Sequence, residues 1–154
     1  MGDCCGASKN ATNDVVCPLS KTKGKQVKLI TLKSLLDANA LARLESDKTY
    51  YFCSEQECNV VYFNEEQQVF IKNDLKVPVF QKDIQEDVPA CYCFNWTRSR
   101  IHEEIKQTGK SQVVQEISMH IKADRCGCEV NNPQGSCCLG NVSAFIKQIE
   151  KSYY

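Results

Sequence analysis

Short runs of aromatic and β-branched residues dominate the first half of the chain and predict a small antiparallel sheet. Three such runs stand at 49–53, 59–63 and 67–71, and each is bounded by polar residues, as strands usually are. The polar segment 64–68, with the sequence NEEQQ, separates the last two runs and predicts a hairpin turn.

A shorter strand and a helix are predicted ahead of this sheet. Residues 27–30 favour a strand, and Thr31 is placed to cap a helix over 32–44. Leucines recur along that segment at approximately helical spacing. Residues 15–80 are therefore expected to form a small unit that mixes helix and sheet.

Beyond that unit the apolar positions follow a helical period. Residues 81–90 are polar, contain one proline and predict a linker. A helix is predicted over 96–107, with isoleucines on one face, and Gly109 is expected to end it. Ser111 can cap a second helix, and a third amphipathic helix is predicted to begin near Cys138.

These elements predict the α+β class. A small α/β sheet unit at 15–80 is followed by a linker at 81–90 and a helical unit at 91–154. Residues 1–14 are polar and rich in small side chains, so we expect a mobile N-terminal tail.

Charge and hydropathy exclude several classes of protein. The 154 residues include 19 Lys and Arg and 19 Asp and Glu, so the formal net charge is zero. This balance gives no electrostatic reason to expect binding to nucleic acid. No apolar run reaches the length of about 18 residues that a membrane span needs. The start of the chain lacks the basic and apolar regions of an export signal, so we expect a cytoplasmic protein.

Cysteine usage changes this plain picture. The chain contains 11 cysteines; the number is odd and the cysteines are clustered. A reducing cytoplasm keeps thiols free, so clustered cysteines there are more typical of metal sites than of disulfides.

The cysteines of the second half predict a [2Fe–2S] site. Cys91 and Cys93 form a Cys-x-Cys pair ahead of the first helix, and a second group surrounds an Asn-Pro-Gln-Gly turn. A [2Fe–2S] cluster needs four thiolates. The turn can fold the chain back and bring Cys128 together with Cys137 or Cys138. If the third helix begins there, its free backbone N–H groups would point at the sulfurs and stabilise their charge.

Two questions stay open at this distal site. A single zinc ion also suits thiolate ligands, and ordinary thiols or disulfides are a further alternative. Six cysteines also compete for four positions. We expect one spare thiol in the pair Cys126 and Cys128 and another in the pair Cys137 and Cys138.

The cysteines of the first half predict a small zinc site. Cys17 lies in a Cys-Pro turn, and Cys53 and Cys58 follow a predicted strand. Three thiolates from two loops are typical of structural zinc sites, and zinc would stabilise a sheet too small to be stable alone. The alternative is that Cys53 and Cys58 are half-buried thiols at a strand end.

The fourth ligand of this zinc site is not evident. Ser20 stands where a Cys-x-x-Cys pattern would place the second cysteine. Cys4 or Cys5 could fold back to complete the site, or a water could do so. Cys4 and Cys5 could instead bind a soft ion such as Cu(I), or have no role.

Three blocks of sequence then carry a family resemblance. YYFCSEQECNVVYF, VPACYCFNW and CEVNNPQGSCCLGNV occur in this order, and together they resemble the N-terminal module of the CopZ copper chaperone family. The resemblance runs from about residue 17 to residue 145. The helical half is also similar to [2Fe–2S] domains of the bacterioferritin-associated ferredoxin type.

The resemblance implies two cofactors, one zinc ion and one [2Fe–2S] cluster. It places the cluster on Cys91, Cys93, Cys128 and Cys138. It places zinc on Cys17, Cys53 and Cys58. Two departures stand against the family pattern: Ser20 replaces a cysteine, and we expect the copper-carrying C-terminal domain, with its Met-x-Cys-x-x-Cys loop, to be missing.

The functional expectation is a [2Fe–2S] and zinc protein that transfers single electrons in the handling of a metal ion, copper being the candidate. We expect no enzyme activity beyond metal-ion reduction or electron transfer. The expected partners are a separate copper-carrying domain or a copper-transporting ATPase, with an unknown electron donor. Two alternatives remain, a module that holds Cu(I) on spare thiols and a purely structural zinc domain for protein interactions.

Overall fold

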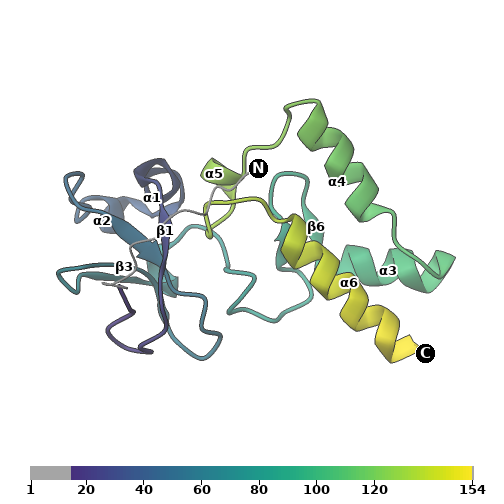
Figure 1. Cartoon of the computed structure of the whole chain (residues 1–154), viewed down its shortest axis with the longest axis horizontal. Coiled ribbons are helices and arrows are strands. Elements are labelled where there is room, and N and C mark those ends of the chain that lie inside the picture. The colour runs from purple at the N-terminus through teal and green to yellow at the C-terminus, as the bar shows by residue number, and fades with distance from the viewer. Residues whose placement is uncertain (1–14, 154) are drawn as a thin grey trace.

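The structure is a computed structural model that describes residues 15–153. It has the predicted α+β class, with an antiparallel sheet and two short helices in the first half and the longer helices in the second (Figure 1). Expectations for the N-terminal tail, including every role of Cys4 and Cys5, lie outside the described residues. None of the helices in the described part of the chain has the length and apolar character needed to cross a membrane.

The sheet of the first half has four antiparallel strands in the order β1-β2-β3-β4. The three predicted strands and the hairpin between the last two are confirmed. Asn64 closes that hairpin, because its side-chain oxygen accepts hydrogen bonds from the amides of Glu66 and Gln68. The strands are β1 (Lys25–Val27), β2 (Tyr50–Phe52), β3 (Val60–Asn64) and β4 (Val69–Ile71), and β4 is followed by the 3-10 helix η3 (Lys72–Asp74).

The helix predicted over 32–44 is two short helices. They are α1 (Leu29–Leu35) and α2 (Ala38–Leu41). The chain becomes extended between them, and the Asp37 side chain caps α2 by accepting from the Ala40 amide. The prediction that Thr31 is a cap is wrong, because Thr31 lies inside α1 and its hydroxyl donates to the carbonyl of Glu129. The strand predicted at 27–30 also ends early, at Val27.

The second half consists of a two-stranded ribbon and four helices. Gly109 ends the first long helix with a left-handed φ of 85°, as predicted, and Thr97 caps its start. Ser111 accepts a hydrogen bond from the Val113 amide at the start of the next helix. The elements are β5 (Pro89–Cys91), β6 (Trp96–Thr97), α3 (Arg98–Thr108), α4 (Val113–Lys122), α5 (Cys128–Asn131) and α6 (Leu139–Tyr153).

Each half has its own apolar core. One core lies between the sheet and the helices α1 and α2, and includes the fully buried Tyr62 and Phe70. The other packs α3, α4 and α6 around Ile101, Ile117 and Val142. The division into two units and its boundaries stay a prediction.

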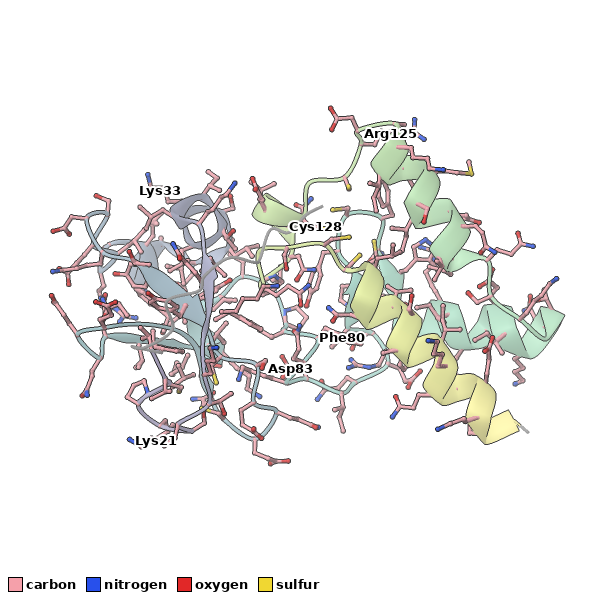
Figure 2. All side chains as sticks on the ribbon, in the orientation of Figure 1. Lys21, Lys33, Phe80, Asp83, Arg125 and Cys128 are labelled. Carbon is pink, nitrogen blue, oxygen red and sulfur yellow. The ribbon has the colours of Figure 1, made fainter. Side chains whose placement is uncertain are left out.

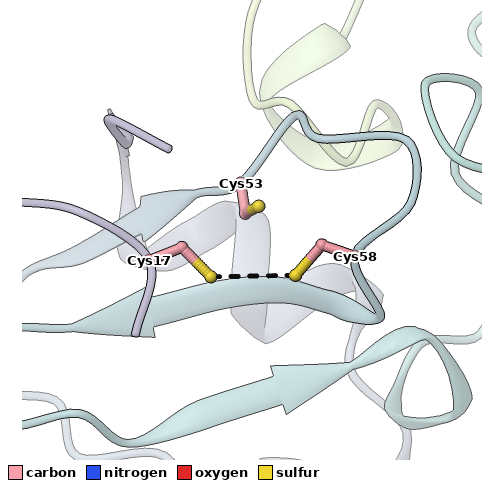
Figure 3. Close-up of side chains that lie close together, drawn as sticks. All are labelled: Cys17, Cys53 and Cys58. Carbon is pink, nitrogen blue, oxygen red and sulfur yellow. Dashed lines mark hydrogen bonds between the residues drawn. The ribbon is translucent and has the colours of Figure 1, made fainter. Parts of the chain in front are cut away.

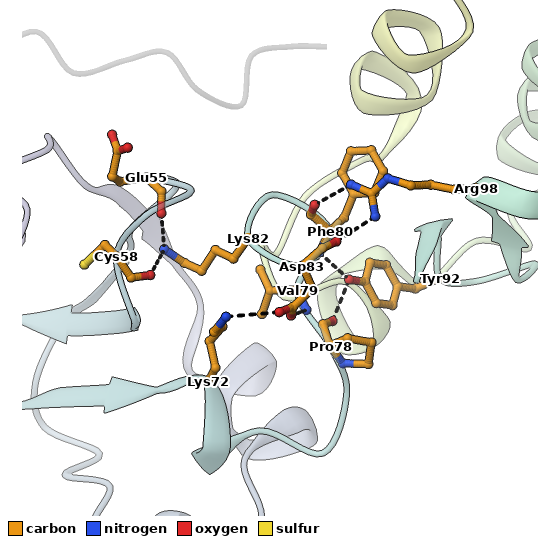
Figure 4. Close-up of polar contacts among 10 residues, drawn as sticks. All are labelled: Glu55, Cys58, Lys72, Pro78, Val79, Phe80, Lys82, Asp83, Tyr92 and Arg98. Atoms are coloured by element: carbon orange, nitrogen blue, oxygen red, sulfur yellow. Dashed lines mark hydrogen bonds and ion pairs between the residues drawn. The ribbon is translucent and has the colours of Figure 1, made fainter. Parts of the chain in front are cut away.

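The segment between the halves, predicted as a polar linker at 81–90, is hydrogen-bonded on both sides (Figure 4). Lys82 donates to backbone carbonyls of the first half. Asp83 accepts from Lys72, also of the first half. From the second half, buried Arg98 donates to the carbonyls of Phe80, Asp83 and Gln85.

Candidate metal centres

Three cysteines meet at one end of the sheet (Figure 3). Cys17 comes from the turn ahead of β1, Cys53 directly follows β2, and Cys58 lies just before β3. Their exposed fractions are 0%, 0% and 6%, so the thiols are part of a small apolar cluster with Val60 and Phe63. Their sulfur atoms all lie within 4.8 Å of one another.

This spacing fits a tetrahedral zinc ion. The Sγ atoms of Cys17 and Cys58 are 3.8 Å apart. Two thiolates on one zinc ion, each bonded at about 2.3 Å with a tetrahedral angle, are separated by about 3.8 Å. Among residues 15–153, this is the single group of three or more Cys, His, Asp or Glu side chains brought so close together.

The thiols of Cys17 and Cys58 differ in how easily they lose a proton. Burial raises the pKa of the Cys17 thiol, but hydrogen bonds from the amide and hydroxyl of Ser20 outweigh it, and the net pKa lies below the usual value. Burial raises the pKa of Cys58. Cys17 is therefore the thiol of this pair that loses its proton more easily, which favours metal binding because thiolates are the ligands.

Lys82 is a charged residue of this site that the sequence analysis did not single out. Its side chain is only 5% exposed and reaches from the connecting segment into the site (Figure 4). Its Nζ donates to the carbonyls of Glu55 at 2.7 Å and Cys58 at 3.0 Å, and to the Sγ of Cys53 at 3.7 Å. No local signal marks Lys82, since its partners lie 24 to 29 residues away in the sequence.

A second group of thiols gathers in the other half. Cys91 ends β5, Cys93 lies in the turn that follows, Cys128 begins α5, and Cys138 stands just ahead of α6. Cys91 and Cys138 are buried, whereas Cys93 and Cys128 are half-buried. Figure 2 shows Cys128 near the middle of the molecule, between the sheet half and the helical half.

These four thiols form a chain of contacts. The Sγ atoms of Cys93 and Cys128 are 3.8 Å apart, and Cys138 lies close enough to Cys128 and Cys91 to shift the pKa of both thiols. Interaction with Cys138, and then with Cys93, lowers the pKa of Cys128 to about 3, and interaction with Cys138 lowers that of Cys91 to about 7. The same interactions raise the pKa of Cys93 and Cys138. The structure thus brings together the four cysteines that the resemblance implies for a cluster.

Polar groups of the backbone face these sulfurs. The Gly127 amide donates to the Sγ of Cys93 at 3.1 Å, and the side-chain amide of Asn131 approaches the same atom at 3.5 Å. The amides of Cys138 and of the turn after Cys91 add to the lowering of the pKa of Cys128 and Cys91. That the start of the last helix presents N–H groups to a cluster stays a prediction.

The two remaining cysteines flank this group. Cys126 is half-buried and Cys137 is exposed. Both line an open cavity of about 540 Å³ that also touches Cys128, with Lys25 and Lys28 on its far wall.

The loop that carries these cysteines rests on the first half. Helix α5 lies against α1, where Lys28 pairs with Glu129 at 2.6 Å. The Tyr62 hydroxyl in β3 donates to the carbonyl of Pro133 at 2.6 Å. Gly135, with a φ of 73°, packs against Val27, and a Cβ atom there would stand 3.1 Å from the Val27 side chain.

Comparisons with known proteins define the class first. Residues 14–76 match the zf_CopZ family, described as a zinc binding domain. Together with the three-cysteine group, this match identifies the first half of the chain as a domain of the zinc-binding type.

Two comparisons with one relative, by sequence and by structure, then define the family. The chain is 38% identical over 122 residues to the copper chaperone CopZ of Archaeoglobus fulgidus, a match that covers 79% of this chain and 57% of that protein. It therefore spans little more than half the length of that curated relative. Its fold is similar to the X-ray structure of the Archaeoglobus fulgidus CopZ N-terminal domain, with a TM-score of 0.72 and 32% identity over 84% of this chain and 96% of that one. The chain belongs to the CopZ family, as a counterpart of its N-terminal domain.

Proposed function

We propose that Cys91, Cys93, Cys128 and Cys138 hold a [2Fe–2S] cluster and that the chain transfers single electrons in the handling of a metal ion. The observation that carries this proposal is the convergence of four thiols from separate segments, each accompanied by a hydrogen-bond partner. A bound [2Fe–2S] cluster would supply one-electron chemistry, and four thiolates are the ligand set that it requires.

The spread of these thiols supports two iron atoms over one zinc ion. The zinc-type triangle at the sheet is compact, with all sulfurs within 4.8 Å. Among the described residues, no three of the four distal thiols lie within 4.8 Å of one another. Such a wider arrangement suits a cluster with two thiolates on each iron better than one tetrahedral ion.

The chain's own residues tune such a site. N–H donors at the sulfurs, from Gly127, Asn131 and Cys138, stabilise negative charge there and make a cluster easier to reduce. Burial of Cys91 and Cys138 keeps water from one side of the proposed cluster, while half-buried Cys93 and Cys128 leave its other side near the protein surface. Electrons would enter and leave on that exposed side.

Copper is the metal ion we propose to be handled. The relative that matches most of this chain is named a copper chaperone, and we propose the same ion here, with reduction of Cu(II) to Cu(I) as the electron-transfer step. The partners would be a copper-carrying domain or a copper-transporting ATPase. We propose the cytoplasm as the location of this protein, because clustered cysteines that bind metal are typical of a reducing compartment.

We further propose Cys17, Cys53 and Cys58 as the zinc ligands. Their burial and spacing support this assignment. They join the turn before β1 to the loop between β2 and β3, so a zinc ion on them would stabilise the sheet half directly.

Metal analysis tests both assignments. We expect purified protein, handled without oxygen, to contain two iron and two sulfide ions and one zinc ion per chain, and to give a paramagnetic resonance signal after reduction with dithionite. Serine variants at Cys91, Cys93, Cys128 and Cys138 should lose iron and keep zinc. Protein with zinc but no iron or sulfide would refute the cluster and favour the structural zinc domain.

Serine variants of the neighbouring cysteines are the matched controls. Cys126→Ser and Cys137→Ser each change a thiol within two residues of a proposed ligand, and we expect both to keep the full iron content. If Cys126→Ser lost iron and Cys128→Ser kept it, the choice within that pair would be wrong.

A second candidate function is the holding of a soft metal ion on the two spare thiols. Cys126 and Cys137 line the same cavity beside Cys128. Burial, Cys128 and then Cys137 raise the pKa of Cys126. Two thiolates are sufficient ligands for Cu(I).

Competition with a Cu(I) chelator tests this second candidate. The double variant Cys126→Ser/Cys137→Ser should lose one Cu(I) per chain and keep its iron. The variant Cys4→Ser/Cys5→Ser examines the other proposed soft-metal thiols, which lie outside the described residues. If the first variant binds copper as tightly as the parent chain, the spare thiols do not form this site.

A further inference from the structure

Ser20 lies over the three-cysteine site, where a fourth ligand would be needed. Its Oγ is 3.4 Å from the Sγ of Cys53, and its hydroxyl and amide are both hydrogen-bonded to the thiol of Cys17. The hydroxyl is held in place from outside the site, because the Thr22 amide donates to it at 3.2 Å. The side chain therefore touches two of the three sulfurs.

The separations match a tetrahedron with one oxygen corner. A zinc ion with sulfur at about 2.3 Å and oxygen at about 2.0 Å places the oxygen about 3.5 Å from each sulfur. The separation between Ser20 and Cys53 is 3.4 Å, and the separation between Cys17 and Cys58 is 3.8 Å. The distance from Ser20 Oγ to Cys53 Sγ and the distance from Cys17 Sγ to Cys58 Sγ thus both fit the edges of one zinc tetrahedron.

We propose that the Oγ of Ser20 is the fourth zinc ligand, which makes this a three-thiolate, one-oxygen site whose charge is neutralised by Lys82. This inference rests on the zinc ligands proposed above. It concerns the position where the chain departs from a four-cysteine pattern.

The charge of the site explains why Lys82 is buried beside it. Three thiolates and a divalent ion leave one negative charge, and a buried charge is costly unless it is paired. The ammonium group of Lys82 supplies one positive charge 3.7 Å from the Sγ of Cys53. Its three N–H groups have three acceptors, two carbonyls and this sulfur. With an oxygen ligand and Lys82, the whole group is neutral.

The proposed oxygen ligand, Ser20, is also the ligand of this site that is nearest to solvent. Ser20 is half-buried, whereas the three cysteines are buried. A neutral hydroxyl donates less charge to zinc than a thiolate does, so this is the bond that an incoming ligand can replace.

Zinc K-edge X-ray absorption on the full-length protein tests the ligand set, because iron elsewhere in the chain does not contribute to it. We expect three sulfur neighbours at about 2.3 Å and one oxygen at about 2.0–2.1 Å. Ser20→Cys should convert the site to four sulfurs, a gain of about one third in the sulfur signal. Ser54→Cys is the matched control: Ser54 is exposed next to Cys53, so its thiol should leave the spectrum unchanged.

Several outcomes would overturn the inference. The first is four sulfur neighbours in the parent chain, and loss of one of them in Cys4→Ser/Cys5→Ser would identify the tail as their source. Another is a Ser20→Cys spectrum that keeps its oxygen. A third is Ser20→Ala with zinc affinity equal to that of the parent. Absence of bound zinc from the parent would instead refute the proposed zinc ligands, which keeps the two failures distinguishable.

Lys82→Met tests the charge argument, since methionine retains most of the side-chain volume. We expect zinc affinity to fall by about 10–100-fold, as is typical when a partner of a metal ligand is removed, while the three sulfur neighbours remain. The combination Lys82→Met with Ser20→Cys should bind zinc more weakly than Ser20→Cys alone, because the four-thiolate site carries more negative charge. Equal affinities with and without Lys82 would refute its role.

Discussion

The hydrogen bond from Tyr62 to Pro133 is the connection between the halves that can be tested most cleanly. The Tyr62 side chain is 0% exposed, Pro133 is buried, and their oxygen atoms are 2.6 Å apart. Tyr62→Phe removes the hydroxyl alone and leaves the buried carbonyl of Pro133 without its donor. We expect unfolding to become easier by about 1–3 kcal/mol, the usual cost of such an unsatisfied group.

The same variant should also loosen the cluster loop, because Pro133 lies between Cys128 and Cys138. Urea unfolding followed by circular dichroism measures the stability, and the melting temperature should fall by roughly 2–4 °C for each kcal/mol lost. Bleaching of the visible absorbance in the presence of a chelator measures release of the cluster. We expect this release to be faster in Tyr62→Phe than in the parent chain.

Tyr50→Phe is the matched control. Tyr50 lies in the neighbouring strand and is 1% exposed. Its hydroxyl donates to the side chain of Gln68 at 2.6 Å and accepts from the Glu45 amide at 3.1 Å, away from the cluster loop. It should cost stability of a similar size without changing the rate of bleaching. If the two variants bleach at the same rate, the bond between Tyr62 and Pro133 does not support the cluster loop and the reasoning fails.

Three further outcomes are expected. Gly135→Ala should destabilise the protein by about 1–2 kcal/mol through its left-handed backbone, with added strain from close contacts; thermal unfolding equal to the parent would contradict this. Arg98→Met removes the three hydrogen bonds of a buried guanidinium. In urea unfolding, it should lower the free energy of unfolding by at least about 3 kcal/mol. The control Arg100→Met changes an exposed arginine and should lower it by less than about 1 kcal/mol. In metal-free protein, the pKa of Cys128 is lowered and that of Cys126 is raised. The alkylation rate of Cys128 should therefore stay nearly constant from about pH 6 to pH 8, whereas that of Cys126 should rise about tenfold per pH unit. Mass spectrometry that finds parallel pH profiles for the two thiols would refute this.

Local patterns predicted the strands well and the helices of the first half poorly. The runs that became β2, β3 and β4 are rich in aromatic and β-branched residues and bounded by polar turns, so each carries its own signal. The leucine pattern over 32–44 continued across Asp37, where the chain starts a second helix. Thr31 could not be placed, because its hydroxyl serves a contact with Glu129, 98 residues further along the chain.

At the candidate sites, too, local sequence patterns predicted some features and missed others. Cysteine spacing was sufficient to predict both groups of thiols and one spare thiol in each of the pairs Cys126/Cys128 and Cys137/Cys138; the choice within each pair came from the family resemblance and stays a prediction. The groups that surround the sulfurs were not predicted. Lys82 and Gly127 reach their sulfur partners across 29 and 34 residues, and such contacts depend on the path of the folded chain.

The closeness of the thiols also makes metal-free protein sensitive to oxidation. Sulfur pairs stand 3.8 Å apart at both sites, Cys17 with Cys58 and Cys93 with Cys128, and a disulfide needs them to approach to about 2.05 Å. Thiols that are already adjacent and partly ionised are favourable partners for that reaction. A chain that meets oxygen before it meets metal would therefore become trapped in crosslinked forms, and a bound ion or cluster acts as a protecting group for its own ligands.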